Sequence, residues 1–443
     1  QQNIPVRYFQ LDSWWYKKGE DNGVALWEPK ADVFPGGLEK LHQKLSLPFV
    51  LHNRYWSAAA EYGNKFHFVK DARGGLPDDQ TFWSHLLETA HRNGCVVYEQ
   101  DWLNHQFHRL LELRNNVELA DRWLHQMDKA AQNNQLSIQY CMALPADFLE
   151  TSLLPAVTQI RASYDYSPGS DQWRIGLTSM LACALGLAPS KDTFWSTAQQ
   201  DGSPYKDAFE PNCKLEALVA TLSCGPVGPG DAIGKADRAL LLKTCRADGL
   251  LLKPDFPAVP IDRSLLQDEN LSGEIWCTSS NYAGRKWRYL LVAGQSKEAV
   301  IRAADLGITE KSIAYENSTG TISVFDNEHP LWVKRQAPST NKVQFNYFTI
   351  APVHDNTAFF GETSKFVTVS RQRFANISSD HRTINLAGSA GEKVELTWQW
   401  ALAAPKRIDV NGQQATFHFD YKQKILTLPV VVPPTGKATI RIL

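Results

Sequence analysis

The sequence lacks the features that several common classes of protein require. It contains no run of about 18–20 consecutive apolar residues, which is the length that a membrane-spanning helix needs. Its formal net charge is only −1 over 443 residues, so it offers no excess of basic residues to nucleic acid or to an anionic membrane. We therefore expect neither nucleic acid nor a membrane as a partner.

Motifs for metals, nucleotides and activated serines are absent as well. None of the 7 cysteines forms a CxxC pair, and no G-x-S-x-G elbow occurs. The glycine-rich stretch at 225–230 contains two prolines, which lack the N–H donors that a phosphate-binding loop needs. His105 and His108 are three residues apart, and we interpret them as residues of a loop or a helix face. We expect no metal and no organic cofactor.

The composition is that of a globular protein with a large core, because 43% of the residues are hydrophobic and 21% are charged. The length predicts two or three domains. Three glycosylation sequons begin at Asn270, Asn317 and Asn376, and they favour a secreted or lysosomal glycoprotein. The sequence leaves open whether disulfides form among Cys183, Cys213, Cys245 and Cys277.

The first part of the chain alternates short apolar runs with amphipathic segments, which is typical of β/α repeats around a parallel sheet. We expect helices at 38–45, 81–92 and 117–131 and a buried helix within the apolar stretch 176–189. The expected strands lie at 7–12, 48–54, 95–102, 136–143, 159–166, 193–196 and 217–225.

These repeats predict a (β/α)₈ TIM-barrel-like catalytic domain over residues 1–255. Seven strands are expected where such a barrel has eight, so we expect the first strand to be missing or to come from another segment or chain. A passage punctuated by prolines at 254, 257 and 260 marks the domain boundary. Residues 256–443 show period-two runs and turn signals, which predict an antiparallel β-sandwich. Its expected strands lie at 287–293, 321–325, 343–350, 366–369, 393–400, 416–419 and 424–428.

Two aspartates stand at the polar ends of strand-like runs. Asp101 follows the run that begins at Cys95, and Asp165 lies four residues after Arg161. Catalytic residues of a β/α barrel lie at the carboxyl ends of its strands, and a retaining glycosidase needs two carboxyl groups. The sequence therefore predicts Asp101 and Asp165 as a catalytic pair.

Five short motifs occur in a fixed order over residues 6–250. They are LDSWW at 11–15 with FPGGL at 34–38, IQYCM at 138–142, RASYDY at 161–166, DTFWS at 192–196 and GPVG at 225–228. In this order the chain resembles the raffinose synthases and related α-galactosidases. The resemblance implies a retaining α-glycosidase in which Asp101 is the nucleophile and Asp165 is the acid/base.

The same resemblance implies further contacts to the sugar. Arg161 matches an arginine that holds the sugar near its 2-hydroxyl, and Asp12 matches an aspartate that binds sugar hydroxyls. The other residues that we expect to bind substrate are Trp14, Asn53, Trp56, Glu99, Trp102 and Asp192. Each of the tryptophans is equally well explained as packing.

The sequence departs from the family at Glu99, where relatives carry a lysine that reaches the 3- and 4-hydroxyls. A carboxylate accepts hydrogen bonds where an ammonium donates them, so the sugar need not be galactose. Tyr164 also stands where raffinose synthases often have an aspartate. Glu99 is either a sugar contact or a partner of Arg54.

Two alternatives remain beside hydrolysis of an α-glycoside. The chain is either a transglycosidase, in which a sugar hydroxyl replaces water, or a glycan-binding or structural protein on a decayed barrel. Glu99 and the missing strand favour the non-catalytic alternative, whereas the presence of both aspartates and Arg161 opposes it. The missing strand and the odd number of cysteines also suggest a second chain or a homo-oligomer.

Overall fold

The structure is a computed structural model that describes residues 3–201, 205, 207–266, 268, 271–336 and 342–443. The chain packs as two compact units. The N-terminal unit consists of Val6–Arg161 and Leu181–Pro189, and the C-terminal unit consists of residues 3–5, Ala162–Met180 and Ser190–Leu443. The domain boundary that the sequence places after residue 255 stays a prediction.

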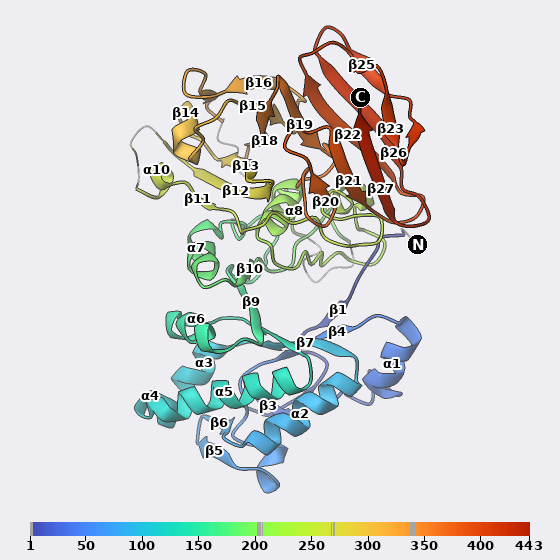
Figure 1. The fold of residues 1–443 in the computed structure, drawn as a ribbon. Helices are drawn as coiled ribbons and strands as arrows, with labels where there is room; N and C mark the ends of the chain where they lie inside the picture. The colour runs from blue at the N-terminus through green and yellow to red at the C-terminus, as the bar shows by residue number, and fades with distance from the viewer. Residues whose placement is uncertain (1–2, 202–204, 206, 267, 269–270, 337–341) are drawn as a thin grey trace. The chain divides into compact units, whose positions relative to one another are not determined.

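A six-stranded sheet forms the centre of the N-terminal unit (Figure 1), in the order β1-β4-β7-β8-β9-β10. The first five of these strands pair in parallel. In the part of the chain that the structure describes, β1 lies at one edge of the sheet, and no strand precedes it. The strands are β1 (Phe9–Leu11), β4 (Phe49–Asn53), β7 (Cys95–Gln100), β8 (Ser137–Tyr140), β9 (Val157–Arg161) and β10 (Ala188–Ser190).

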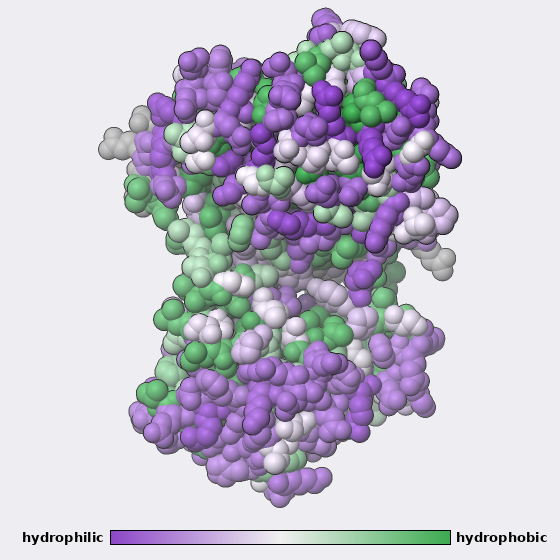
Figure 2. Space-filling model, in the orientation of Figure 1, coloured by the Kyte–Doolittle hydropathy of each residue, from purple (hydrophilic) through white to green (hydrophobic). Residues whose placement is uncertain are grey.

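Alternation along these strands gives the sheet one apolar face and one polar face. Leu51, Tyr98 and Ile138 are fully buried in a core that also contains Trp83 and Trp123 of the covering helices. Figure 1 shows α2 (Gln80–Arg92) and α5 (Val117–Asn133) on this side of the sheet, and their outer surface is hydrophilic in Figure 2. The opposite face carries polar side chains at the paired positions His52, Glu99 and Gln139.

Four helices occur where the sequence predicts them, and in α1 (Gly37–Leu45), α2 and α5 the apolar residues recur on one face. The fourth, within the apolar stretch 176–189, is α7 (Gly176–Ala184). The end of that stretch forms β10 rather than helix, and α7 is not the buried helix that the sequence predicts, since Leu177 is 69% exposed. The remaining helices of this region are α3 (Leu103–Arg109), α4 (Leu111–Asn115) and α6 (Pro145–Glu150).

Three predicted strands are wrong. The segment 217–225 lies mainly in the helix α8 (Cys213–Leu222), whose residues Leu215 to Leu222 are all buried. A helix that is buried on every side has no amphipathic period, so its sequence is hard to distinguish from that of a buried strand. The segment 193–196 forms only an isolated bridge from Phe194 to Pro229, and 366–369 is buried but irregular.

The described part of the C-terminal unit contains two large antiparallel sheets, as the sequence predicts, and a small antiparallel pair of β14 (Ala299–Ile301) and β17 (Leu331–Val333). The larger sheet includes β12 (Glu274–Tyr282), β13 (Arg285–Ala293), β15 (Ser312–Glu316), β16 (Ile322–Phe325), β18 (Phe345–His354), β19 (Thr357–Gly361), β22 (Lys393–Trp400), β25 (His418–Asp420) and β26 (Ile425–Val431). The second consists of β20 (Phe374–Ile377), β21 (Thr383–Ala387), β23 (Ile408–Val410), β24 (Gln413–Gln414) and β27 (Lys437–Ile442). Phe359 and Trp398 of the larger sheet share one core with Phe374 and Ile440 of the second, so this part of the chain is a β-sandwich.

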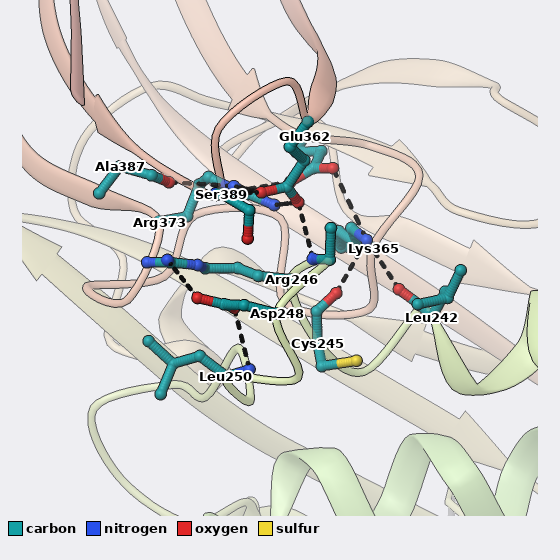
Figure 3. Close-up of polar contacts among 12 residues, drawn as sticks. Leu242, Cys245, Arg246, Asp248, Leu250, Glu362, Lys365, Arg373, Ala387 and Ser389 are labelled. Atoms are coloured by element: carbon teal, nitrogen blue, oxygen red, sulfur yellow. Dashed lines mark hydrogen bonds and ion pairs between the residues drawn. The ribbon is translucent and has the colours of Figure 1, made fainter. Parts of the chain in front are cut away.

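A buried ionic network joins the loop after α9 (Arg238–Leu241) to the sandwich (Figure 3). Arg373, which is 1% exposed, contacts Glu362 at 2.8 Å and Glu392 at 2.6 Å. Glu392 in turn accepts the backbone N–H of Ala247 at 2.9 Å. Burial opposes ionisation of Glu392, but the hydrogen bonds and the charge of Arg373 lower its pKa to about 2.

All seven cysteines lie within the described residues, and none forms a disulfide. Asn270 of the first sequon lies outside the described residues. In the second sequon, Nδ2 of Asn317 donates to the backbone oxygen of Tyr347 at 3.2 Å, whereas Asn376 is exposed on β20. No helix among the described residues is both long and apolar enough to cross a membrane.

Candidate functional site

The central feature of the N-terminal unit is a contact between His52 and Asp101 at the carboxyl ends of two adjacent strands. Asp101 directly follows β7, and its backbone N–H donates to the oxygen of Asn53 at 2.7 Å. Nε2 of His52 lies 3.1 Å from Oδ2 of Asp101, and both side chains are buried. The other oxygen of Asp101 accepts the N–H of Trp102 at 2.6 Å. The carboxylate is therefore fixed at the strand end.

The surroundings of the pair favour its ionised form. Burial lowers the pKa of His52, but the hydrogen bond to Asp101 and the negative charges of Asp12 and Asp101 raise the pKa above its ordinary value. Burial raises the pKa of Asp101, whereas His52, the thiol of Cys141 and the charge of Arg161 bring it below its ordinary value. Both shifts point to a buried imidazolium–carboxylate pair.

The other nitrogen of His52 is fixed by Tyr16. The Tyr16 hydroxyl lies 2.9 Å from Nδ1, and the two rings are stacked with centroids 6.0 Å apart. When the ring is protonated, both nitrogens donate, Nδ1 to the Tyr16 hydroxyl and Nε2 to Asp101. Tyr16 thus orients the ring toward the carboxylate.

Glu99 lies beside this pair on the polar face of the sheet. It accepts hydrogen bonds from Nε2 of Gln10 at 2.6 Å and from Nε2 of Gln139 at 3.1 Å. Burial raises the pKa of Glu99 to about 8; His52 acts against this shift, and Asp101 adds to it. Glu99 is therefore mainly a neutral carboxylic acid near neutral pH. Its side-chain contacts are to these two amides rather than to Arg54, which lies over the ring of Trp102 at 4.5 Å.

Asp12 and Arg161 belong to the same strand-end cluster. Asp12 follows β1 and is exposed, and its Oδ1 lies 3.8 Å from Nε2 of His52. Arg161 is the last residue of β9, and its charge lowers the pKa of both Glu99 and Asp101. The structure thus brings together four of the residues that the sequence singles out, Asp12, Glu99, Asp101 and Arg161.

The remaining predicted residues of this unit differ in their contacts and exposure. Nδ2 of Asn53 donates to Oε1 of Gln100 at 3.2 Å, in keeping with the alternation that separates Asn53 from His52. Trp56 is 0% exposed, so it fills the core rather than presenting a face to a ligand. Trp14 is 48% exposed and stacks on Phe34 with ring centroids 5.7 Å apart. Trp102 directly follows Asp101 and has a left-handed backbone conformation, with a φ of 59°, at the start of α3.

Asp165 and Asp192 lie together in the C-terminal unit. Asp165 is exposed and lies in a loop four residues beyond β9, rather than within a strand. Oδ2 of Asp192 accepts the N–H of Tyr166 at 2.7 Å, and the N–H of Asp192 donates to Oγ of Ser163 at 2.8 Å. Asp192 therefore fixes the loop that carries Asp165. The roles of both residues stay predictions.

Sequence reasoning selected Asn53 but not its neighbour His52. It also missed Gln10, Tyr16 and Gln139. The signal that could have found them is the alternation of side chains along each strand. It shows that His52, Glu99 and Gln139 share one face only in combination with the strand register, which pairs the three positions. That register is a property of the folded sheet.

A group of side chains on the surface of the N-terminal unit could hold a metal ion. Asp121 and His125 on α5 and Glu150 on α6 place ligand atoms within 4.8 Å of one another. Oδ1 of Asp121 already lies 3.3 Å from Nδ1 of His125, and all three side chains are at least partly exposed. Such groups are common on protein surfaces, and we assign no metal to this one.

Comparison with known proteins supports the fold. No protein-family model and no curated protein matches the sequence. Among solved structures, the chain is similar to a GH27 β-L-arabinopyranosidase from Geobacillus stearothermophilus, with a TM-score of 0.56 and 13% identity over 79% of this chain and 88% of that one. A variant of that enzyme in complex with arabinose matches with a TM-score of 0.56 and 12% identity, over 78% and 89% of the two chains.

This likeness concerns the fold. It confirms the predicted architecture, a TIM-barrel-like part followed by a β-sandwich. The identity is too low for the likeness to carry an activity to this chain.

Proposed function

We propose that the chain is a glycoside hydrolase that cleaves α-glycosides with retention and uses Asp101 as its nucleophile. The observation that carries this proposal is the buried, ion-paired carboxylate at the carboxyl end of β7. A nucleophilic carboxylate must be ionised when the sugar binds, and His52 favours that state. In TIM-barrel-like folds, catalytic side chains occupy this end of the strands.

Asp165 is the proposed acid/base. It would protonate the departing oxygen in the first step and would then deprotonate the water that attacks the glycosyl–Asp101 ester. The loop held by Asp192 gives this carboxyl group a defined backbone. Asp12 and Arg161 are proposed to bind sugar hydroxyls beside Asp101.

Glu99 is proposed to act as a neutral group at the sugar. A protonated carboxyl donates one hydrogen bond and accepts others, whereas the lysine found in relatives only donates. Because burial raises the pKa of Glu99 to about 8, this donor is present near neutral pH. Glu99 thus replaces part of the lysine's hydrogen bonding without its charge.

The candidate substrates are α-D-galactosides and β-L-arabinopyranosides. One structural neighbour is a β-L-arabinopyranosidase, and a structure of its variant holds arabinose. β-L-arabinopyranose has the ring configuration of α-D-galactopyranose without the hydroxymethyl group, so one pocket can accept both rings. A comparison of the two 4-nitrophenyl glycosides measures how much space remains for that group.

Rescue by an external nucleophile tests the mechanism. Asp101→Ala should abolish hydrolysis of a 4-nitrophenyl α-galactoside or β-L-arabinopyranoside, and added azide should restore turnover with formation of a glycosyl azide of inverted configuration. Asp165→Ala should slow the hydrolysis of substrates with poor leaving groups far more than the hydrolysis of aryl glycosides. Glu88→Gln, an exposed change on α2, is the matched control. Retention of full activity in Asp101→Ala would refute the assignment.

A non-catalytic glycan-binding protein is the second candidate. It is favoured by Glu99, which stands in place of the lysine of relatives, and by the tight ion pair that holds Asp101 to His52. Sugar binding in the absence of any turnover, with or without an added acceptor, would select this alternative. Turnover that rises with an added sugar acceptor would select transglycosylation.

A secreted or lysosomal location also stays a proposal. It rests on the sequons, of which Asn376 is exposed on β20, whereas the amide of Asn317 is engaged in hydrogen bonds. Glycopeptide mapping of protein made in a secretory host should find a glycan on Asn376. An unmodified Asn376 would count against this location.

A further inference from the structure

A cavity of about 390 Å³ lies in the C-terminal unit, and none of its lining residues is assigned above to catalysis. Its walls come from the first half of α8, the start of β18, the turn after β15 and the loop after β19. A volume of this size is at the lower end of the range for small-molecule sites. The cavity can therefore hold a molecule of the size of a single sugar.

The charge of this cavity has one sign. Its described lining contains four lysines, Lys214, Lys243, Lys342 and Lys365, and no aspartate or glutamate. Neither Lys214 nor Lys243 forms an ion pair with an acidic side chain of the described residues. Burial lowers the pKa of Lys214, and the neighbouring charge of Lys243 lowers it further. Two ammonium groups thus repel each other at the wall, a cost that a bound anion would offset.

Two of the cationic side chains are held in place. Nζ of Lys214 lies 5.7 Å from the ring centroid of Phe345. Nζ of Lys365 donates to the backbone oxygens of Leu242 at 2.7 Å and Cys245 at 2.8 Å (Figure 3). Lys365 also forms an ion pair with Glu362 at 3.8 Å, which offsets its charge, so the positive charge open to a ligand comes mainly from Lys214 and Lys243.

Polar groups complete the lining. Nδ2 of Asn317 donates to Tyr347 and Thr349, but its Oδ1 is buried without a hydrogen-bond partner among the described residues. The nearest acidic side chain that acts on Lys214 is Glu316, and it already accepts hydrogen bonds from Asn346, Ser318 and Thr319. A buried acceptor without a donor costs free energy, and a ligand hydroxyl would satisfy it.

We propose that this cavity binds a small anionic ligand, in which a phosphate, sulfate or carboxylate group is carried by a polar body of sugar size. The anion lies between Lys214 and Lys243, and a hydroxyl of the body donates to Oδ1 of Asn317. The site is separate from the proposed catalytic cluster, so it stands or falls independently of glycosidase activity.

Titration calorimetry on the full chain at low ionic strength tests this site. The probes are glucose 6-phosphate, glucose 6-sulfate and glucuronate, with inorganic phosphate and neutral glucose beside them. At least one acidic sugar should bind, more tightly than inorganic phosphate, and its affinity should fall as salt is added. The preferred probe identifies the anion. Absence of binding by all the acidic sugars at millimolar concentration, or equal binding of glucose, would overturn the proposal.

Variants localise the binding. The double variant Lys214→Ala/Lys243→Ala should lose at least tenfold in affinity for the preferred acidic sugar, and Lys393→Ala, an exposed change on β22 outside the cavity, should lose none. Lys214→Glu, at an exposed position on α8, gives a single-residue test if the double variant folds poorly. Unchanged affinity in both the double variant and Lys214→Glu would place the anion elsewhere. Glycosidase activity should be the same in all these variants.

Discussion

Nε2 of His52 lies 3.1 Å from Oδ2 of Asp101, and this contact joins the ends of two adjacent strands through residues that are 49 positions apart in the sequence. Because both side chains are buried, each stabilises the charge of the other in a place where water does not. The contact therefore makes Asp101 a carboxylate over a wide range of pH. It also makes the site dependent on a histidine that no motif singled out.

Removal of the positive charge at His52 should shift the pH dependence of catalysis. His52→Gln should raise the pKa of Asp101, because burial is then opposed by fewer charges. The acidic limb of the kcat/KM profile should therefore move to higher pH. Tyr16→Phe, which removes the contact at the other nitrogen and keeps the ring, should move it less. An unchanged acidic limb in His52→Gln would contradict the ion pair.

Glu99 should make the protein less stable as pH rises. Its pKa is about 8 in the folded state and about 4.5 when unfolded, so the folded state binds the proton more tightly. Stability is then highest below the unfolded pKa and falls as pH rises from about 4.5 to about 8. Glu99→Gln should remove this loss, which we expect to be on the order of 1–3 kcal/mol.

Urea denaturation at about pH 5 and about pH 8 measures this loss for the parent, Glu99→Gln and the control Glu88→Gln. The difference between the two pH values should shrink only in Glu99→Gln. The same difference in all three proteins would show that Glu99 titrates normally.

Trp56 and Trp14 should respond in opposite ways to truncation. Trp56 is wholly buried among aromatic rings, so Trp56→Ala should lower the free energy of unfolding by about 3–5 kcal/mol. Trp14 is half exposed, so Trp14→Ala should change stability by no more than about 0.5 kcal/mol. A higher KM in Trp14→Ala would support contact with the sugar. A large loss of stability in Trp14→Ala would mean that it is a packing residue.

The Arg373 network should be essential to the C-terminal unit. Arg373→Met leaves Glu362 and Glu392 buried without their cation, and we expect a loss of about 3–5 kcal/mol in chemical denaturation. Arg371→Met is the matched control, because Arg371 is 58% exposed and its ion pair with Asp255 should contribute only about 0–1 kcal/mol. Similar losses in the two variants would contradict this account.

Much of the fold could be predicted from local pattern. The strands β4, β7 and β8 show short apolar runs that end in polar residues, and α2 and α5 show a helical period. Prediction failed where burial is complete, because 217–225 offers no polar face that would distinguish helix from strand. It also failed at 366–369, because this segment is buried like a strand although its backbone is irregular.

The site could be predicted only in part. Asp12, Glu99, Asp101 and Arg161 are visible as strand-end residues and through resemblance to a family, and they do lie in one cluster. The contacts around these residues could not be found, since His52, Gln10 and Gln139 reach them across strands. Such contacts depend on register, which a single sequence does not contain.

The most direct test of the central claim is mass spectrometry of the intact protein after incubation with activated 2-fluoro glycosides, α-galactosyl and β-L-arabinopyranosyl first. These reagents trap the glycosyl-enzyme of a retaining glycosidase, because fluorine slows its hydrolysis. The account predicts one added sugar, located on Asp101 by peptide mapping and absent from Asp101→Asn. An adduct on another carboxylate, or none from any sugar in a protein that binds glycans, would contradict it.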